Sequence, residues 1–218
     1  MPRPAKHATI PVAFANSTTP VKKQERAIQT HEHLIMAARK VFARDGFAQA
    51  RIEDIAALAG KTRGAFYTNF RDKEDVFIAI IEDDFNRYKK DFLRNLCRTT
   101  SVEEKREALA QHFYKVICDE QRVLLMLEFK MYAIRHPQKK KRLADLHHAI
   151  CARFSEGEMS QYLGEFKHKT GIEKRRETAR VSAAIDGLAI NRLFDPESFS
   201  EERVMTLLRS IAAELFDC

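Results

Sequence analysis

The segment 51–70 constrains the fold more strongly than any other part of the chain. In its first half, RIEDIAALAG, the apolar residues recur at the spacing of one face of a short helix. Gly60 stands where a left-handed turn residue would end that helix, and Thr62 can cap a second helix over residues 63–69. Two short helices joined by a glycine-containing turn are typical of a helix-turn-helix, whose second helix can lie in the major groove of DNA.

The rest of the chain is predicted to be helical as well. It has only 7 glycines and 6 prolines in 218 residues, and no segment shows a convincing β-strand alternation. We therefore expect an all-α protein. Apolar positions recur at helical spacing over residues 25–44, along a long helix from Lys73, and over residues 101–118, 120–135, from 137 onward, 172–194 and 200–216.

Composition narrows the class of protein. The net charge of +7 suits a nucleic-acid partner, although basic proteins are common. The 4 cysteines are scattered without a CxxC pair, which predicts reduced thiols rather than a disulfide framework or a zinc finger. No apolar run approaches the roughly 20 residues of a membrane helix, and we find no signal-peptide pattern. We expect a cytoplasmic protein with no membrane contact and no cofactor.

Further along, GKTRGAFYTNFRDKEDVF resembles the signature of the TetR family of transcriptional regulators. AARKVFARDGF and IEDIAALAG extend the resemblance over about residues 26–78, while HPQKKKRLADLHHAI and AIDGLAINRLFDP resemble one effector-binding branch of that family. The resemblance implies an all-α homodimer of about nine helices. Its parts would be a flexible basic arm (residues 1–25), a three-helix DNA-binding domain (26–74) and a larger effector-binding and dimerisation domain (75–218).

The arm is open to two interpretations. It could be a disordered tail without a role, or it could add phosphate or minor-groove contacts beside the main helix.

The resemblance also implies which residues contact DNA. Arg63 would pair with a guanine edge or bind phosphate, and Tyr67 would reach a phosphate unless it belongs partly to the core. Two positions depart from the family pattern: Lys61 replaces a small apolar residue, and Arg51 follows Ala50 where a Ser or Thr is usual. The expected DNA-binding residues are Arg51, Lys61, Thr62, Arg63, Gly64, Tyr67, Thr68, Asn69 and Lys73.

The body is expected to hold a ligand pocket beside the long helix. Glu128 lies in an apolar run and must be paired, exposed or directed at a ligand, and a partner arginine is the favoured interpretation. Residues of the other candidates' type are more often ordinary core than pocket lining. The expected pocket residues are Phe92, Leu96, Phe113, Glu128, Phe129, Tyr132 and Phe154.

The last two long helices are expected to form the dimer interface, through Ala184, Ile185, Leu188, Leu208 and Ile211, although the same residues could form intramolecular core. His147 and His148 are adjacent and point in different directions from a helix, so no metal site is expected. The basic run 139–142 is interpreted as a solvated helix face, with a surface for an acidic ligand or a surface near DNA as the alternatives.

Together these features predict a DNA-binding repressor that a small-molecule effector releases from a palindromic operator by shifting the long helix. Two alternatives remain: a constitutive DNA-binding protein and a helical adaptor without an effector. An enzyme is not expected, because we find no nucleophile–base pair, metal cluster or phosphate-binding loop.

Overall fold

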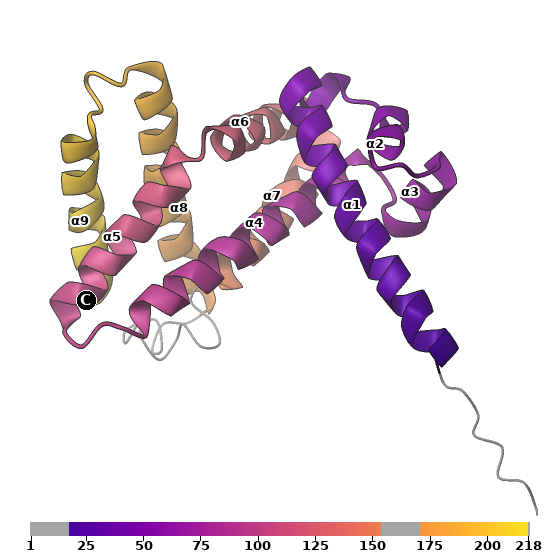
Figure 1. Ribbon diagram of the computed structural model, residues 1–218. Helices are drawn as coiled ribbons and strands as arrows, with labels where there is room; N and C mark the ends of the chain where they lie inside the picture. The colour runs from indigo at the N-terminus through magenta and orange to yellow at the C-terminus, as the bar shows by residue number, and fades with distance from the viewer. Residues whose placement is uncertain (1–17, 154–170, 218) are drawn as a thin grey trace, which may run out of the picture.

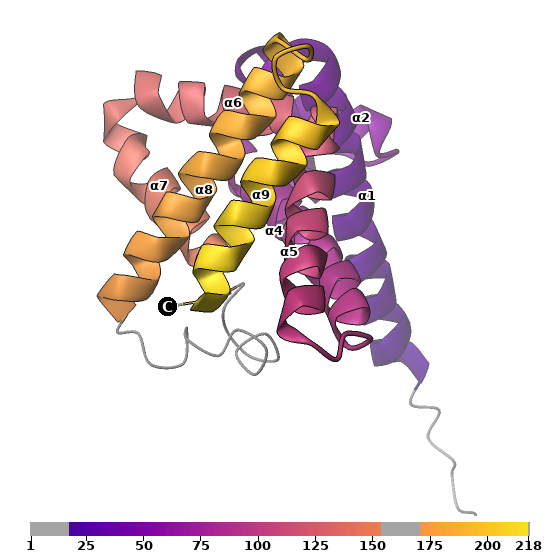
Figure 2. The same ribbon diagram turned by 90° about the vertical axis from the view of Figure 1, so that its left-hand side faces the viewer.

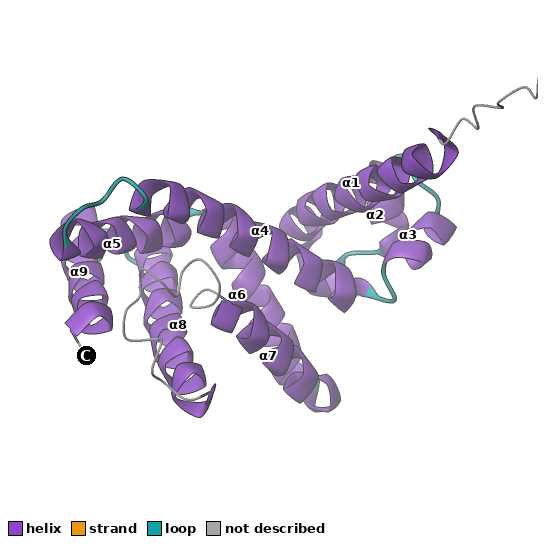
Figure 3. Ribbon diagram, turned by 90° about the horizontal axis from the view of Figure 1, so that it is seen from below, coloured by secondary structure: helices purple, strands orange, loops and turns teal. Residues whose placement is uncertain are grey.

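Every secondary-structure element in the described part of the chain is a helix (Figures 1 and 3). The computed structural model describes residues 18–153 and 171–217, and within these ranges the all-α prediction is confirmed. None of the described helices is long and apolar enough to cross a membrane. The helices are α1 Thr18–Gln49, α2 Ile52–Leu58, α3 Arg63–Asn69, α4 Lys73–Leu96, α5 Val102–Cys118, α6 Glu120–Arg135, α7 Pro137–Ala152, α8 Gly171–Phe194 and α9 Glu201–Asp217.

The first helix is longer than predicted. It begins at Thr18 rather than Glu25, so the last part of the expected flexible arm is helical, and residues 1–17 lie outside the described residues. Its regular geometry is interrupted at Gly46, where φ is +76° and ψ is 157°. Phe47 then turns back onto the helix, with its ring centroid 5.1 Å from that of Phe42.

The two short helices are joined as the sequence predicts. Gly60 has a φ of +65°, the left-handed conformation that lets the chain turn sharply. The Thr62 side chain caps α3 by accepting a hydrogen bond from the backbone N–H of Ala65, with an N···O distance of 3.1 Å. Phe66 is fully buried and packs α3 against α1 and α2.

The long helix α4 connects two hydrophobic cores (Figure 1). Asp72 caps its start by accepting from Asp75 N–H at 2.8 Å. The first half of α4 packs with α1, α2, α3, α6 and α7, and its last residues pack with α5, α8 and α9. Since α6 and α7 share one core with α1, α2 and α3, these three N-terminal helices are not packed as a separate domain.

The two C-terminal helices run in opposite directions against α5 (Figure 2). The ion pair between Arg180 of α8 and Glu214 of α9 links them, with an N···O distance of 2.5 Å. Apolar residues of both helices enter the second core, and the opposite faces of both helices remain uncovered.

Replacing Gly46 with alanine is expected to destabilise the protein by about 1–3 kcal/mol, because side chains rarely adopt its backbone conformation. The new Cβ would also lie 3.1 Å from a carboxylate oxygen of Glu128. Urea denaturation followed by circular dichroism measures the change. Gly64→Ala is the control, because a Cβ there would meet only Thr62 Oγ1 at 3.7 Å. Equal stability of Gly46→Ala and the unaltered protein would contradict this account.

Candidate nucleic-acid interface and internal cavity

Helix α3 presents a polar outer face. Its inner face is fixed by buried Phe66 and by Phe70, on whose ring His31 of α1 stacks with centroids 4.7 Å apart. Because these contacts hold the inner side, the opposite side is directed to solvent. Most of the predicted DNA-binding residues are exposed there or at the adjoining helix ends: Arg51, Thr62, Arg63, Gly64, Tyr67 and Thr68, with Lys61 half-buried beside them.

Arg63 and Tyr67 form a small polar cluster on this face. The Arg63 guanidinium lies 3.0 Å from Glu53 Oε1 of α2, and it donates to Tyr67 Oη at 3.4 Å. Tyr67 is 46% exposed, so it belongs to the surface and not to the core. An exposed ion pair contributes at most about 1 kcal/mol, so a DNA phosphate or base edge can replace Glu53 at low cost.

Two predicted contacts are engaged inside the protein instead. Asn69 donates through Nδ2 to Ala65 O at 2.8 Å. Lys73 donates through Nζ to Ala48 O and Ala50 O, at 2.8 and 3.1 Å, and burial lowers its pKa. Carbonyl groups at the end of a helix lack intrahelical donors, which explains why a lysine is held there. The Lys73 ammonium is therefore directed away from the outer face.

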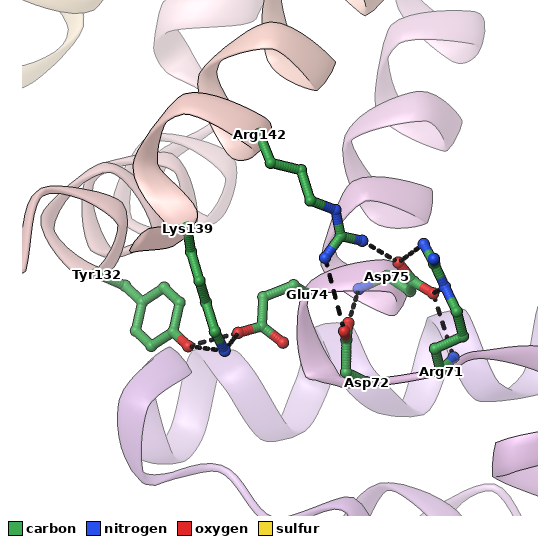
Figure 4. Close-up of polar contacts among 7 residues, drawn as sticks. All are labelled: Arg71, Asp72, Glu74, Asp75, Tyr132, Lys139 and Arg142. Atoms are coloured by element: carbon green, nitrogen blue, oxygen red, sulfur yellow. Dashed lines mark hydrogen bonds and ion pairs between the residues drawn. The ribbon is translucent and has the colours of Figure 1, made fainter. Parts of the chain in front are cut away.

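A polar network that sequence reasoning missed joins the body to the start of α4 (Figure 4). On α4, Glu74 is only 4% exposed and accepts hydrogen bonds from Tyr132 of α6 and Lys139 of α7. Next to it, Asp75 pairs with Arg142 of α7 at 2.9 Å. We call these five residues the α4–α7 network. Its only signal in the sequence is the basic run 139–142, which is not simply a solvated face because Lys139 and Arg142 are both engaged.

The network extends towards the loop before α4. Arg71 binds Asp75 at 2.6 Å, and Arg142 also lies 3.8 Å from Asp72 (Figure 4). Burial raises the pKa of Glu74, but the hydrogen bonds from Lys139 and Tyr132 outweigh it and lower the pKa to about 2. Since this pKa lies below the ordinary 4.5, Glu74 stabilises the fold above about pH 4.5 and loses that contribution only as the pH falls towards 2.

A cavity of about 150 Å³ lies along α4 at the point where this helix passes from one core to the other. Six helices contribute to its wall, which is mostly apolar. The apolar lining consists of Ile81, Phe85, Leu109, Phe113, Val116, Ile150, Val181, Ile185 and Leu215. The polar lining consists of Tyr88, Lys89, His112, Arg122, His147, Cys151, Thr178 and Ser182.

Of the predicted pocket residues that the structure describes, only Phe113 lines this cavity. Phe92 and Leu96 are fully buried in the second core, and Phe129 stacks on Phe77 in the first. These corrections share one cause: helical periodicity identifies an inward face but does not show where that face lacks a packing partner.

Two further pocket predictions are corrected by polar contacts. Tyr132 belongs to the α4–α7 network, and Glu128 accepts a hydrogen bond from Phe47 N–H rather than pairing with an arginine. Phe154 lies outside the described residues.

The polar groups of the cavity are mostly uncharged at neutral pH. Burial lowers the pKa of His112 to about 3 and that of His147 to about 4. The Tyr88 hydroxyl donates to Asp119 Oδ2 at 2.6 Å, and the Cys151 sulfur lies 3.7 Å from His147 Nε2. The described residues contain no group of His, Cys, Asp or Glu that could hold a metal ion.

The predicted dimer residues divide between the interior and the surface. Ile185 and Leu208 are buried within the chain, while Ala184, Leu188 and Ile211 are half-buried. The apolar side chains that face outwards on α8 and α9 are others: Ile190 is 36% exposed, Phe194 87% and Leu207 47%. A count of apolar residues could not separate the two faces, because both carry them.

Both the N-terminal and the C-terminal part of the chain match models of known protein families. A family model described as bacterial regulatory proteins, tetR family, matches residues 34–80. A model described as the C-terminal part of a BetI-type transcriptional repressor matches residues 102–217, more than half of the chain. The HTH-type transcriptional regulator AcrR of Shigella flexneri is 26% identical over 212 residues, which cover 89% of this chain and 93% of AcrR.

Solved structures share the fold. FadR of Bacillus subtilis, in complex with stearoyl-CoA, gives a TM-score of 0.56 at 19% identity over 85% of this chain and 97% of FadR. A transcriptional regulator of Saccharomonospora viridis, in complex with choline, gives 0.60 at 18% identity over 84% of this chain and 95% of that protein. Because the two family models cover the helix-turn-helix and the helical body alike, this chain belongs to the TetR family of DNA-binding transcriptional regulators.

Proposed function

We propose that the protein is a homodimeric repressor, which a small molecule bound in the cavity releases from a palindromic DNA operator. One observation carries this proposal: α4 and α7 both line the cavity, and the same two helices meet in the α4–α7 network beside the recognition helix α3. A ligand that moves either helix therefore acts on elements that position α3.

DNA recognition is assigned to the outer face of α3. Arg63 supplies a guanidinium that fits a guanine edge or a phosphate, and the hydroxyl of Tyr67 suits a phosphate oxygen. Gly64 leaves room for close approach of the DNA, since it has no side chain and is exposed. Arg51 and Lys61 add positive charge at the ends of the two short helices.

Dimerisation is assigned to the outward faces of α8 and α9. On α8, Ala183, Gly187, Ile190 and Phe194 follow one another at intervals of three or four residues, so they form one stripe. A Cβ added at Gly187 would meet nothing within 4 Å, which leaves space for another backbone to approach. In a two-fold dimer the same surface of both chains meets, so we assign a second copy of the chain to this stripe, and the dimer would place two α3 helices for successive major grooves, about 34–36 Å apart.

Coupling between the cavity and α3 is assigned to α6 and α7 as well as α4. On α7, His147, Ile150 and Cys151 line the cavity, while Lys139 and Arg142 at the other end bind α4. On α6, Arg122 lines the cavity, and Tyr132, further along the helix, binds Glu74. An effector changes operator affinity only if it binds the two arrangements of these helices differently.

The ligands of the structural neighbours support a ligand-binding role for the body. FadR is described with stearoyl-CoA and the Saccharomonospora viridis regulator with choline, so this fold accommodates chemically different molecules.

The assignment of α3 is tested by replacing Arg63 with alanine and Tyr67 with phenylalanine. Each change is expected to weaken binding to the operator, obtained by selection from random DNA, by about 1–3 kcal/mol. Fluorescence anisotropy at fixed salt measures the dissociation constant. The control is Arg98→Ala, an exposed arginine just after α4, far from α3. Unchanged affinity in both α3 variants would contradict the assignment and favour a helical adaptor.

The dimer face is tested with Ile190→Glu. A charge on the proposed interface is expected to shift sedimentation from dimer to monomer and to weaken operator binding, while the circular dichroism spectrum stays the same. Leu124→Glu is the control, because Leu124 on α6 is 53% exposed but lies outside this face. An unaltered dimer in the Ile190→Glu variant would rule out this surface.

The α4–α7 network is tested with the double change Lys139→Met and Arg142→Met. Loss of both cations is expected to speed amide hydrogen exchange over residues 71–76 and to change operator affinity by about 0.5–2 kcal/mol. Lys141→Met is the matched control, because Lys141 pairs only with Asp145 of its own helix among the described residues. If exchange and affinity in the double variant match the control, the network does not position α3.

A further inference from the structure

We infer that the cavity selects a ligand whose apolar body is about the size of one aromatic ring and which carries a carboxylate. Arg122 binds this carboxylate. This inference rests on the proposed function, since it names the chemical class of the effector for the same cavity.

The charge on the cavity wall is of one sign. Among the described residues that line it, Arg122 and Lys89 are the only ionised ones, and none is Asp or Glu. Of the two lining histidines, His112 is buried and His147 is half-buried, and the loss of solvent around them lowers their pKa values to about 3 and about 4, so both are neutral at physiological pH. A positive wall in an apolar surrounding favours an anion and disfavours a cation.

Arg122 is held at the wall without a counter-ion. It lies in the first turn of α6, where the helix dipole disfavours a cation, and it is half-buried. The side chain forms no ion pair with any described residue. A half-buried guanidinium in this position gains most from a carboxylate, which it can bind through two parallel hydrogen bonds.

The carboxylate of Asp119, three residues before Arg122, is already engaged. It accepts hydrogen bonds from the Tyr88 hydroxyl at 2.6 Å and from the backbone N–H of Arg122 at 3.0 Å. It also lies 3.6 Å from the Arg87 guanidinium. The contact with Arg122 is through the backbone, so the guanidinium remains available to a ligand.

The position of the Arg122 charge is visible in its effect on the surrounding groups. Burial is the main cause of the lowered pKa values of His112 and His147, and the Arg122 charge lowers both further. The same charge opposes the rise in the pKa of Cys151 that burial causes. These effects on groups of α5 and α7 agree with the place of Arg122 among the residues that line the cavity.

A cationic ligand such as a quaternary ammonium finds no comparable site. Such ligands are bound over aromatic faces. Here the ring of Tyr88 already faces the Arg87 guanidinium at 5.0 Å. The ring of Phe85 faces both Lys89 and Arg153, at 6.0 and 5.9 Å. Protein cations therefore already face two of the aromatic rings that line the cavity and would repel an ammonium group there, so this chain should differ from the neighbour described with choline.

The volume sets the size of the apolar body. At about 150 Å³ the cavity compares with engineered protein cavities that hold a benzene molecule. One aromatic ring with a short chain fills such a space, and the chain brings a terminal carboxylate to the wall. Phe113, Ile150 and Ile185 are among the residues that would contact the ring.

The test uses three probes with one apolar body: 3-phenylpropanoate, 3-phenylpropan-1-ol and 3-phenylpropyltrimethylammonium. Isothermal titration calorimetry on the full chain without DNA gives each affinity. The carboxylate is expected to bind at least about tenfold more tightly than the alcohol, and the ammonium more weakly than either.

Arg122→Met, which keeps an apolar stem, should remove the preference for the carboxylate and leave the alcohol affinity unchanged. Arg122→Lys should keep part of the preference for the carboxylate.

The matched control is Arg135→Met, an exposed arginine on the same helix that does not line the cavity. Three results would overturn the inference: no binding of the carboxylate, equal or tighter binding of the ammonium, or a carboxylate preference that survives in a folded Arg122→Met variant. If that variant does not fold, the three probes on the unaltered protein and the Arg122→Lys variant still decide.

A separate measurement keeps this inference apart from the proposed function. Operator affinity is measured with and without saturating 3-phenylpropanoate. If the carboxylate binds through Arg122 but operator affinity is unchanged, the effector role of the cavity fails and the ligand class stands. If a cell extract releases the operator while the carboxylate does not bind, the ligand class fails and the effector role stands.

Discussion

The structure depends on the continuity of α4. A single helix contributes Phe77 and Ile80 to the core beneath the helix-turn-helix, and Phe92 and Leu96 to the core shared with α8 and α9. A continuous hydrogen-bonded helix transmits a displacement along its axis more readily than a flexible linker does, because a sharp bend would disturb its backbone hydrogen bonds. The cavity lies between these two cores, at a part of α4 whose side chains are incompletely packed.

Electrostatics decides how the start of α4 is held. Glu74 is nearly inaccessible to solvent, so its charge is tolerated only because Tyr132 and Lys139 both donate to it. Breaking one partner would leave a buried carboxylate poorly compensated, which makes the contact selective for one arrangement of α4 and α7. A purely apolar contact would tolerate sliding. The network thus specifies a position more than it adds stability.

Local features could be predicted from the sequence, whereas features that depend on distant packing could not. Gly60 and Thr62 act within a few residues of themselves, so the turn and the cap of α3 followed directly. The network joins residues such as Glu74 and Lys139, which no local pattern connects. Likewise, Phe92 and Tyr88 both point inward from α4, yet only Tyr88 reaches the cavity, because the neighbouring helices close over Phe92. The buried position of Leu208 and the exposed one of Leu207 follow from the same dependence on neighbours.

If Arg63 contacts DNA as proposed, its ion pair with Glu53 changes the free energy of DNA binding and the dependence of that binding on salt. A free arginine that meets a phosphate releases a counter-ion from the DNA, which steepens the dependence of affinity on ionic strength. In this protein Arg63 is already paired with the Glu53 carboxylate. When the guanidinium turns to the DNA, that carboxylate would lose its partner and stay close to the DNA. Because an exposed ion pair of this kind contributes at most about 1 kcal/mol, exchanging Glu53 for DNA would cost little, and the main effect of the retained Glu53 charge would be a weaker non-specific attraction to DNA.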